Sequence, residues 1–199
     1  MKLRGEIVLD PKNKIKQWLE RAKNEIDGNW NAMCVSTIDV NNTPDSRMVL
    51  FKEYSEDDNL IFFTNYNSKK GQDIRNNSAI CATFFWDKFD TQLRIKGFVK
   101  ITSREVSRKY FDSRPFASRV AAIVSNQSNK IDSYESLREK YERLQKDLSE
   151  SDISCPEHWG GVEIVPTRIE FWEGHKNRLH KREVFELHED SWEVSLISP

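Results

Sequence analysis

The sequence lacks paired cysteines. Its three cysteines, Cys34, Cys81 and Cys155, are odd in number and far apart. Zinc sites and redox dithiols use cysteines at short paired spacing, so this arrangement argues against both kinds of site. We therefore expect reduced cysteines that pack in the core, and we expect no metal site.

Long apolar runs and an excess of either charge are also missing. The first 14 residues contain no apolar stretch of the signal-peptide kind, and the longest apolar runs, such as residues 60–63, are far too short to cross a bilayer. The 31 basic and 32 acidic residues leave a net charge of −1, which gives no reason to expect a nucleic acid or an anionic membrane as partner. We expect a cytoplasmic protein in which any anion site is local.

Aromatic residues are abundant despite the high charge. Six Trp, five Tyr and eleven Phe accompany 32% charged residues, which indicates a compact core rather than global disorder. At 199 residues the chain is long enough to bury such a core without disulfides. We expect a single domain over residues 1–199.

Short β-rich runs separated by polar turns predict most of the secondary structure. Strands are expected over residues 32–39, 46–53, 59–65, 79–86, 91–101, 161–173, 178–187 and 192–197. Short strands joined by short turns favour antiparallel pairing, and this number of strands favours a closed or nearly closed barrel. The predicted fold is mainly β, with helices packed outside the barrel.

Helical spacing of apolar residues after Pro11 predicts a helix over residues 11–27. A short helix should follow Ser68, whose hydroxyl suits the N-cap position. Further helices are expected over residues 104–112, 115–124 and 134–149. Residues 104–149 therefore form a helical segment between two groups of strands.

Three basic or titratable side chains alternate near the C-terminus: Arg178, His180 and Arg182. Successive side chains of a β-strand point to opposite faces, so these three would line one face. Such a row is tolerated most easily where an anionic or electron-rich ligand lies against it. A solvated edge strand, whose charges discourage pairing between sheets, explains the same pattern and is favoured on spacing alone.

Basic residues in two other segments indicate anion sites. Lys69 and Lys70 occupy the first turn of their helix, where the helix dipole disfavours cations, and an anion bound to the free backbone N–H groups would compensate. Extension of both side chains into water explains them equally well. Arg47 and Lys52 lie five residues apart on a predicted strand and face opposite sides, which suits two anionic groups better than one.

Tyr110, Arg114 and Ser118 are spaced by four residues where two predicted helices meet. Phosphate recognition uses guanidinium, hydroxyl and backbone N–H donors together, and all three are available here. An ordinary helix junction is an equally simple explanation. Together with the other basic segments, the pattern points to one or more ligands with more than one phosphate.

Seven segments, spread in order over about 135 residues, resemble the pyridoxamine 5'-phosphate oxidase family of FMN-dependent enzymes, which make pyridoxal 5'-phosphate. They are residues 47–52 (RMVLFK), 63–70 (FTNYNSKK), 92–97, 110–118 (YFDSRPFAS), 124–128 (VSNQS), 159–161 (WGG) and 169–182. The resemblance implies the FMN-binding split barrel, an antiparallel Greek-key barrel with helices outside. Residues 11–27 would be its N-terminal helix, 104–149 a helical insertion, and 159–199 the strands that complete the site.

The resemblance also implies a set of FMN contacts in a homodimer with FMN at the subunit interface. The FMN phosphate would be held by Arg47, Lys69 and Lys70, with Gln127 and Ser128 contributing from the partner subunit. The flavin would be lined by Arg47, Met48, Val49, Leu50, Phe51, Lys52, Phe63 and Thr64. Gln92, Trp172 and Arg182 would also contact FMN.

A substrate set follows from the same resemblance. The substrate phosphate would be bound by Lys52, Tyr110, Arg114 and Ser118. The expected catalytic residues, Arg178 and His180, would lie against the pyridine ring. His180 would act as a general base or, with its pKa lowered by the flanking arginines, as a neutral partner that orients the substrate.

The implied reaction moves a hydride from the substrate C4' carbon to flavin N5, after which O2 reoxidises the flavin and yields hydrogen peroxide. The expected partners are pyridoxamine or pyridoxine 5'-phosphate and O2. One alternative is a flavin oxidase for another ring system, as in phenazine biosynthesis. A substrate without phosphate would, however, have no use for the cluster of Lys52, Tyr110, Arg114 and Ser118. Another alternative is a protein that binds FMN or pyridoxal phosphate without turnover.

Three features depart from the family pattern. Lys181 stands where relatives usually carry an acidic residue or Asn, and it would face away from the ligand row, so we expect a changed supporting ion pair rather than changed chemistry. Ile123 stands where relatives often carry Trp, which we interpret as a packing change. The basic, Tyr-containing N-terminal segment of many relatives is shortened, which would affect substrate affinity or closure over the site.

Overall fold

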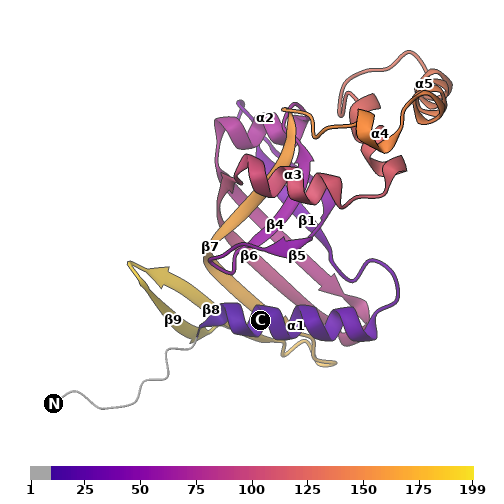
Figure 1. Cartoon of the computed structure of the whole chain (residues 1–199). Helices are drawn as coiled ribbons and strands as arrows, with labels where there is room; N and C mark the ends of the chain where they lie inside the picture. Colours follow the sequence, from indigo (N-terminus) through magenta and orange to yellow (C-terminus); the bar gives the residue numbers. More distant parts are fainter. Residues whose placement is uncertain (1–9) are drawn as a thin grey trace.

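The computed structural model describes residues 10–199, so the prediction about the N-terminal segment lies outside the described residues. Within this range an antiparallel sheet of nine strands curls into a half-barrel (Figure 1). Helix α1 lies at one end of the half-barrel, α2 and α3 lie at the other end, and α4 and α5 project to the side. The structure confirms the mainly β, antiparallel architecture with helices outside.

The sheet divides at its longest strand. The strands are β1 (Ala32–Ile38), β2 (Pro44–Leu50), β3 (Glu53–Tyr54), β4 (Leu60–Asn65), β5 (Ala79–Trp86), β6 (Thr91–Ile101), β7 (Trp159–Glu173), β8 (Lys181–His188) and β9 (Ser191–Leu196). Their order is β2-β1-β5-β6-β7-β4-β3, with β8 paired to β7 and β9 to β8. The first part of β7 pairs with β4 and its last part pairs with β8, so β7 connects the barrel to the β8–β9 hairpin.

Local sequence explains where the helices begin. They are α1 (Pro11–Glu25), α2 (Lys69–Asn76), α3 (Arg104–Asp112), α4 (Phe116–Val124) and α5 (Tyr134–Asp147), with 3₁₀ turns at Asp87–Phe89 and Glu150–Asp152. Asp10 caps α1 ahead of Pro11, and the Ser68 side chain accepts a hydrogen bond from the Gly71 N–H, as predicted for an N-cap.

Alternation along the strands determines the main core. In β1, Met33 and Val35 point inward and are fully buried. Helix α1 covers this core with Ile15, Leu19 and Ala22, which lie on one helical face. Burial of each large apolar side chain contributes about 1.5–3 kcal/mol, so this face fixes α1 to the barrel.

A second core holds the helical segment against the start of β7. Trp159 is buried against Phe111 of α3 and belongs to the same cluster as Val120 and Val124 of α4. Partly buried side chains of α5, including Tyr141, complete the cluster. This packing places the junction of α3 and α4 over the sheet, where the candidate site lies.

Several predicted boundaries need correction. Strand β2 spans Pro44–Leu50 rather than 46–53, because the chain leaves the ladder at Phe51 and Lys52 before the short strand β3. Strand β8 begins at Lys181 rather than at residue 178: Arg178 lies in a turn with φ 62°. Pro115 is the N-cap of α4 rather than its first residue. The other boundaries agree within two residues.

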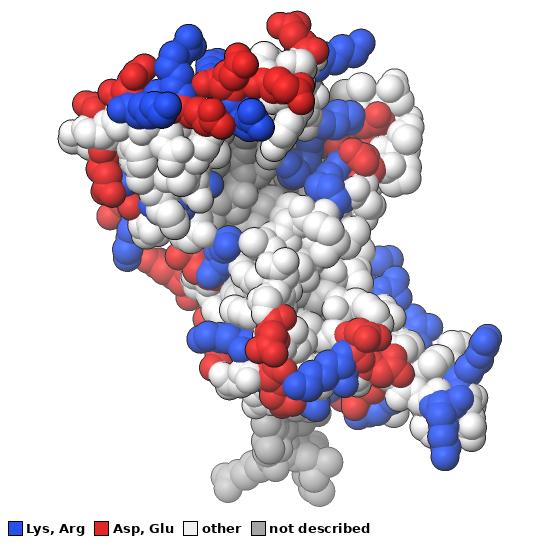
Figure 2. All heavy atoms as spheres, turned by 90° about the vertical axis from the view of Figure 1, so that its right-hand side faces the viewer, with Lys and Arg blue, Asp and Glu red and all other residues white. Residues whose placement is uncertain are grey.

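Surface charge is mixed rather than segregated. Figure 2 shows acidic and basic side chains interspersed at the two ends of one face, whereas the middle of that face carries few charges.

Among the described residues, no helix combines the length and the apolar character needed to span a bilayer.

Candidate functional site

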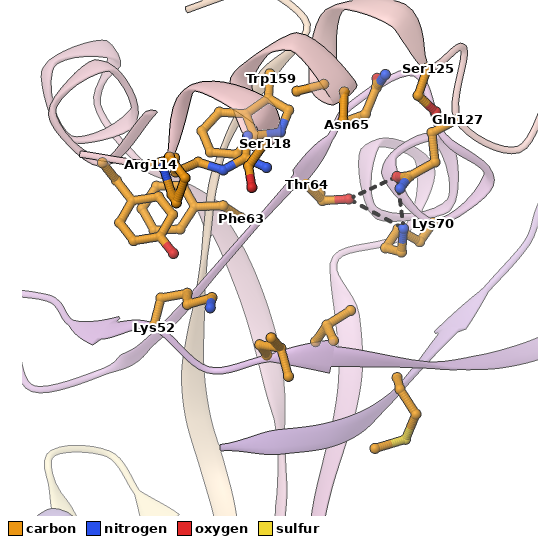
Figure 3. Close-up of a pocket in the computed structure, with 17 residues that line it drawn as sticks. Lys52, Phe63, Thr64, Asn65, Lys70, Arg114, Ser118, Ser125, Gln127 and Trp159 are labelled. Carbon is orange, nitrogen blue, oxygen red and sulfur yellow. Dashed lines mark hydrogen bonds between the residues drawn. The ribbon is translucent and has the colours of Figure 1, made fainter. Parts of the chain in front are cut away.

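A cavity of about 560 Å³ lies between the sheet and the junction of α3 and α4 (Figure 3). Much of its lining was predicted for FMN or substrate: Met48, Val49, Leu50, Lys52, Phe63, Thr64, Lys70, Tyr110, Arg114, Ser118 and Gln127. The remaining lining residues are Asn65, Pro115, Ala121, Ala122, Ser125 and Trp159. The structure thus brings together residues that are up to 111 positions apart in the sequence, from Met48 to Trp159.

One end of the cavity contains a buried cation. Lys70, at the start of α2, is only 8% exposed, and its Nζ donates to Thr64 Oγ1 (3.2 Å) and Gln127 Oε1 (3.1 Å). Within residues 10–199 no carboxylate forms an ion pair with it. Burial, with a smaller contribution from Arg47, lowers the pKa of Lys70. A buried ammonium without a counter-ion is costly, so an anion in this end of the cavity would be stabilised.

Arg47 and Lys69 do not line the cavity; they lie near its Lys70 end and are already paired with carboxylates. Lys69 Nζ lies 2.5 Å from Asp73 Oδ1, and this hydrogen bond raises the pKa of Lys69. Arg47 Nη2 lies 2.6 Å from Asp45 Oδ2 and 3.7 Å from Asp73 Oδ2, while its Nη1 donates to Thr37 Oγ1 (2.7 Å). Both side chains are therefore preorganised, and Lys70 is the member of this set whose charge is not shared with an acid.

Four predicted phosphate contacts converge at the opposite end. Lys52 follows β2, Tyr110 lies on α3, and Arg114 and Ser118 lie at the junction and on α4. Figure 3 shows Lys52, Arg114 and Ser118 on one side of the cavity and Lys70 on the other. Burial lowers the pKa of Lys52, as does the charge of Arg114, and burial also lowers the pKa of Arg114. This end therefore also favours an anion.

Aromatic rings support the guanidinium of Arg114. Its Cζ lies 4.8 Å from the ring centroid of Trp159, and Phe63 stacks on Tyr110 with centroids 3.9 Å apart and planes at 10°. Arg114 Nη1 is buried and has no hydrogen-bond partner in the described part of the chain. Buried donors are nearly always paired, so this atom is an open position for an acceptor.

Three predicted contacts are placed differently from expectation. The Phe51 side chain is 4% exposed and packs in the main core against Trp30 and Tyr54, so it does not line the cavity. Gln127 reaches Lys70 of its own chain, because the turn after α4 already borders the cavity; its assignment to the partner subunit is wrong here. Ser128 is exposed in that turn, with φ 71°, and is not among the lining residues.

The remaining predicted FMN contacts form a row elsewhere on the sheet. In the strand register Gln92 of β6 lies opposite Trp172 of β7, and Trp172 lies opposite Arg182 of β8. Residues directly opposite each other on antiparallel strands point to the same face. Gln92, Trp172 and Arg182 therefore form one continuous surface across three strands.

The loop before β8 places the predicted catalytic pair beside this row. The His180 ring lies 4.6 Å from the Trp172 ring, and its Nδ1 accepts a hydrogen bond from the His175 N–H (3.1 Å). Arg178 is exposed in the turn, so the predicted strand face shared by Arg178, His180 and Arg182 is wrong. Lys181 forms an exposed ion pair with Glu173 (3.1 Å), as expected for a supporting contact.

The row and the Trp159 edge of the cavity lie far apart on one chain. Trp159 borders the cavity at the start of β7, whereas Trp172 lies 13 residues further along the same strand. At roughly 3.3 Å per residue this separation is on the order of 40 Å, less any curvature. Figure 1 shows the two ends of β7 at opposite ends of the half-barrel. A single chain therefore presents two halves of the predicted site.

Comparison with known proteins assigns a family to this arrangement. Residues 16–146 match the family model described as pyridoxamine 5'-phosphate oxidase, and residues 159–199 match the model described as the pyridoxine 5'-phosphate oxidase C-terminal dimerisation region. The chain belongs to the pyridoxamine 5'-phosphate oxidase family. The predicted catalytic pair, Arg178 and His180, falls within this dimerisation region, as do Trp172 and Arg182 of the row.

Curated relatives in this oxidase family match nearly the full chain. Pyridoxine/pyridoxamine 5'-phosphate oxidase from Trichormus variabilis is 40% identical over 195 residues, covering 98% of this chain and 91% of the relative. The enzyme of the same name from Flavobacterium johnsoniae is 41% identical over 198 residues, covering 98% and 92%.

Solved structures of the same oxidase fold confirm the split barrel. PhzG from Burkholderia lata, solved with tetrahydrophenazine-1-carboxylic acid, superposes with a TM-score of 0.89 at 22% identity, covering 96% of this chain and 93% of that one. A pyridoxamine 5'-phosphate oxidase-related, FMN binding protein from Nostoc punctiforme gives a TM-score of 0.79 at 16% identity, covering 98% and 100%.

The sequence did not predict every residue that shapes the site. Trp159 lies in a segment that resembles the oxidase family, but its role as the platform for Arg114 depends on the second core. Asp73 gave a usable signal, because it follows Lys69 by one helical turn and i,i+4 pairs of opposite charge attract. Ser125 lies in the segment 124–128 that resembles the oxidase family, but no contact was predicted for it; it lines the cavity because α4 ends there.

Proposed function

We propose that this chain is an FMN-dependent oxidase that converts pyridoxamine or pyridoxine 5'-phosphate to pyridoxal 5'-phosphate. The observation that carries the proposal is one cavity with two separate cationic ends, at Lys70 and at Arg114, joined by apolar and aromatic walls. An aromatic cofactor with one phosphate and an aromatic substrate with another fit such a cavity. The names of the curated relatives support the same substrates.

The Lys70 end fits the phosphate-bearing cofactor. A buried ammonium with only neutral partners gains most from an anion, and charge-assisted hydrogen bonds are roughly twice as strong as neutral ones. Lys69 and Arg47 flank it in orientations fixed by Asp73. Met48, Val49 and Leu50 supply an apolar edge for the flavin ring.

The Arg114 end fits the phosphate of the substrate. Its unpaired Nη1, the Lys52 ammonium and the Ser118 hydroxyl offer three different donors, and a phosphate accepts several at once. The stacked rings of Phe63 and Tyr110 hold this end in shape. Binding of the phosphate here would fix the distance between the substrate ring and the cofactor, and so orient the reacting carbon.

When bound, FMN would supply the hydride acceptor for the substrate C4' carbon and the electrons that reduce O2 to hydrogen peroxide. The chain contributes cations that stabilise negative charge at the reacting centre, aromatic walls that exclude water and the His180 imidazole, whose Nδ1 is held by the His175 N–H and whose ring lies beside Trp172. Because Nδ1 accepts the His175 N–H, the proton of a neutral His180 lies on Nε2, which leaves Nε2 as a donor toward the ring.

The active unit is a homodimer in which each cavity is completed by the partner subunit's Gln92, Trp172, Arg178, His180 and Arg182. Support comes from the distance along β7, on the order of 40 Å less any curvature, between Trp172 and the Trp159 edge of the cavity in the same chain, and from the dimerisation region matched over residues 159–199. A closed two-fold dimer would form two such sites.

Mixed dimers test this arrangement. Arg114→Ala and Arg182→Ala subunits should each form weakly active homodimers. When the two kinds of subunit are exchanged in equal amounts, half of the dimers should be mixed. Each mixed dimer should contain one site with both mutations and one intact site, so about a quarter of the wild-type activity should return. No recovery after verified exchange would show that both residues serve the same site from one chain.

Substrate choice is tested by comparing phosphorylated and unphosphorylated alcohols. Pyridoxine 5'-phosphate should yield aldehyde and peroxide in equal amounts, whereas pyridoxine should react with a much higher KM because it leaves the Arg114 end empty. Equal kinetics for both compounds, or turnover of a phenazine precursor only, would support the alternative oxidase for another ring system. Bound flavin without any turnover would support a binding protein.

A further inference from the structure

A fully buried carboxylate lies on the same face of the sheet as the Gln92–Trp172–Arg182 row, in the row behind it. Glu170 of β7 is 0% exposed and contacts three arginines from three strands. Its Oε1 lies 2.8 Å from both Nε and Nη2 of Arg182, and its Oε2 lies 3.1 Å from Arg168 Nη1 and 3.3 Å from Arg94 Nη1. Burial alone would raise the pKa of Glu170, but hydrogen bonds from Arg182 and Arg168 and the charge of Arg94 outweigh it and lower the pKa.

The register explains why these groups meet. Arg94, directly opposite Glu170, lies on β6 two residues from Gln92, while Glu170 lies on β7 two residues from Trp172. Side chains two residues apart on a strand share a face, so Glu170 and Arg94 form the next row behind the predicted flavin contacts. Arg182, one row forward on β8, reaches back to Glu170 across this face.

The contact with Glu170 fixes the plane of the Arg182 guanidinium. Two of its nitrogens face one carboxylate oxygen, and the third, Nη1, donates to the Ser198 carbonyl oxygen (3.1 Å). Because a carboxylate oxygen and a carbonyl oxygen hold the guanidinium on two sides, its remaining N–H donors can point in only one direction.

A role in fold stability alone does not require this arrangement. Burying a carboxylate costs several kcal/mol, and apolar residues of similar volume are often as stable or more stable. The presence of Glu170 is therefore explained by its effect on the orientation of the arginines rather than by fold stability.

We propose that Glu170 is a positioning residue that holds Arg182 for its contact with the flavin, and that Arg94 and Arg168 in turn hold Glu170. The proposal rests on the proposed function, in which Arg182 contacts FMN from the partner subunit. It adds a residue to the site that neither the cavity nor the sequence resemblance indicated.

A double-mutant cycle on FMN affinity tests the proposal. FMN is titrated into the full-length apo-protein of four variants: Glu170→Gln, Arg182→Lys, the double variant, and the control Glu186→Gln. Glu186 pairs with Arg168 (3.4 Å) on the same face but is exposed. We expect Glu170→Gln to weaken FMN binding by about tenfold, the double variant to be no weaker than Arg182→Lys, and the control to match the wild type.

Different failures identify different errors. Unchanged FMN affinity in Arg182→Lys would remove the proposed flavin contact, whatever Glu170 does. If Arg182→Lys binds FMN weakly, two results would overturn the positioning role. One is a double variant whose loss of FMN affinity equals the sum of the two single losses, because residues that act independently have additive effects. The other is an unchanged FMN affinity in Glu170→Gln. If Glu170→Gln does not fold, the same cycle is run with Glu170→Asp, which keeps the charge but retracts it by one methylene group, and the same two outcomes decide.

Discussion

Replacing Arg114 with alanine removes the donor that the structure leaves open in the cavity. The buried Nη1 has no partner in the described residues, so a substrate phosphate would be its first acceptor. Hydrogen bonds to charged groups contribute about 1.5–3 kcal/mol each, and a guanidinium can donate two to one phosphate. A net loss of about 2–4 kcal/mol corresponds to a KM that is roughly 30- to 700-fold higher.

The flavin should stay bound in this variant. Lys70, Thr64 and Gln127 lie at the other end of the cavity and form a hydrogen-bonded group that does not include Arg114. The fold should also persist, because the lost stacking on Trp159 is offset by removal of an unpaired buried donor. We expect a melting temperature within about 4 °C of the wild type.

The assay combines steady-state kinetics with pyridoxine 5'-phosphate and fluorescence titration of FMN. Arg108→Ala is the matched control, because Arg108 lies on α3, the helix that leads into the junction with Arg114, but is 62% exposed outside the cavity. A wild-type KM in Arg114→Ala, or loss of FMN affinity with an unchanged KM, would refute the assignment of the two phosphate ends.

Three further predictions follow from the same contacts. Because burial lowers the pKa of Lys52, its charge is lost at a lower pH than that of a free lysine. KM for the phosphorylated substrate should therefore rise as pH increases into that range. A pH series of KM should show this rise in the wild type and no rise in Lys52→Arg, because arginine stays charged. Lys70→Met should weaken FMN binding at least tenfold. It should also raise the melting temperature of the apo-protein by about 2–4 °C, because an apolar side chain replaces a buried ammonium that has no counter-ion. A lower melting temperature would contradict this. Lys181→Ala breaks only the exposed pair with Glu173, worth at most about 1 kcal/mol, so kcat and KM should not change.

Residues near one another in sequence were predictable in space. Tyr110, Arg114 and Ser118 converge because spacing by four places them on adjacent helical turns across one junction. The N-cap at Ser68 was predictable for the same local reason. These features depend on helical geometry and capping, which the sequence expresses directly.

Features that depend on register and loop path were not predictable from local patterns. The alternation of Arg178, His180 and Arg182 suggested a strand face, but a positive φ at Arg178 ends the regular spacing before β8. Phe51 turns into the core because β2 ends at Leu50, three residues before the predicted end of the strand. Both errors arise where a non-glycine turn or a short break interrupts a strand without a marker in the sequence.

The separation of the two halves of the site required the whole sheet. Only the pairing of β7 with β4 at one end and with β8 at the other shows that Trp159 and Trp172 serve different ends of the molecule. The contact of Gln127 with Lys70 likewise depends on how α4 packs on the second core. Long-range packing of this kind decides which predicted residues share a cavity.

The most direct test of the account is reduction of the flavin by substrate in the absence of oxygen. Protein loaded with FMN is mixed anaerobically with pyridoxine 5'-phosphate while the absorption band of oxidised flavin is followed. In an oxidase of the phosphorylated vitamin the band should disappear with one aldehyde formed per flavin, and air should restore it with release of hydrogen peroxide. A band that persists at saturating substrate would contradict the assignment of this chain as an oxidase of the phosphorylated vitamin.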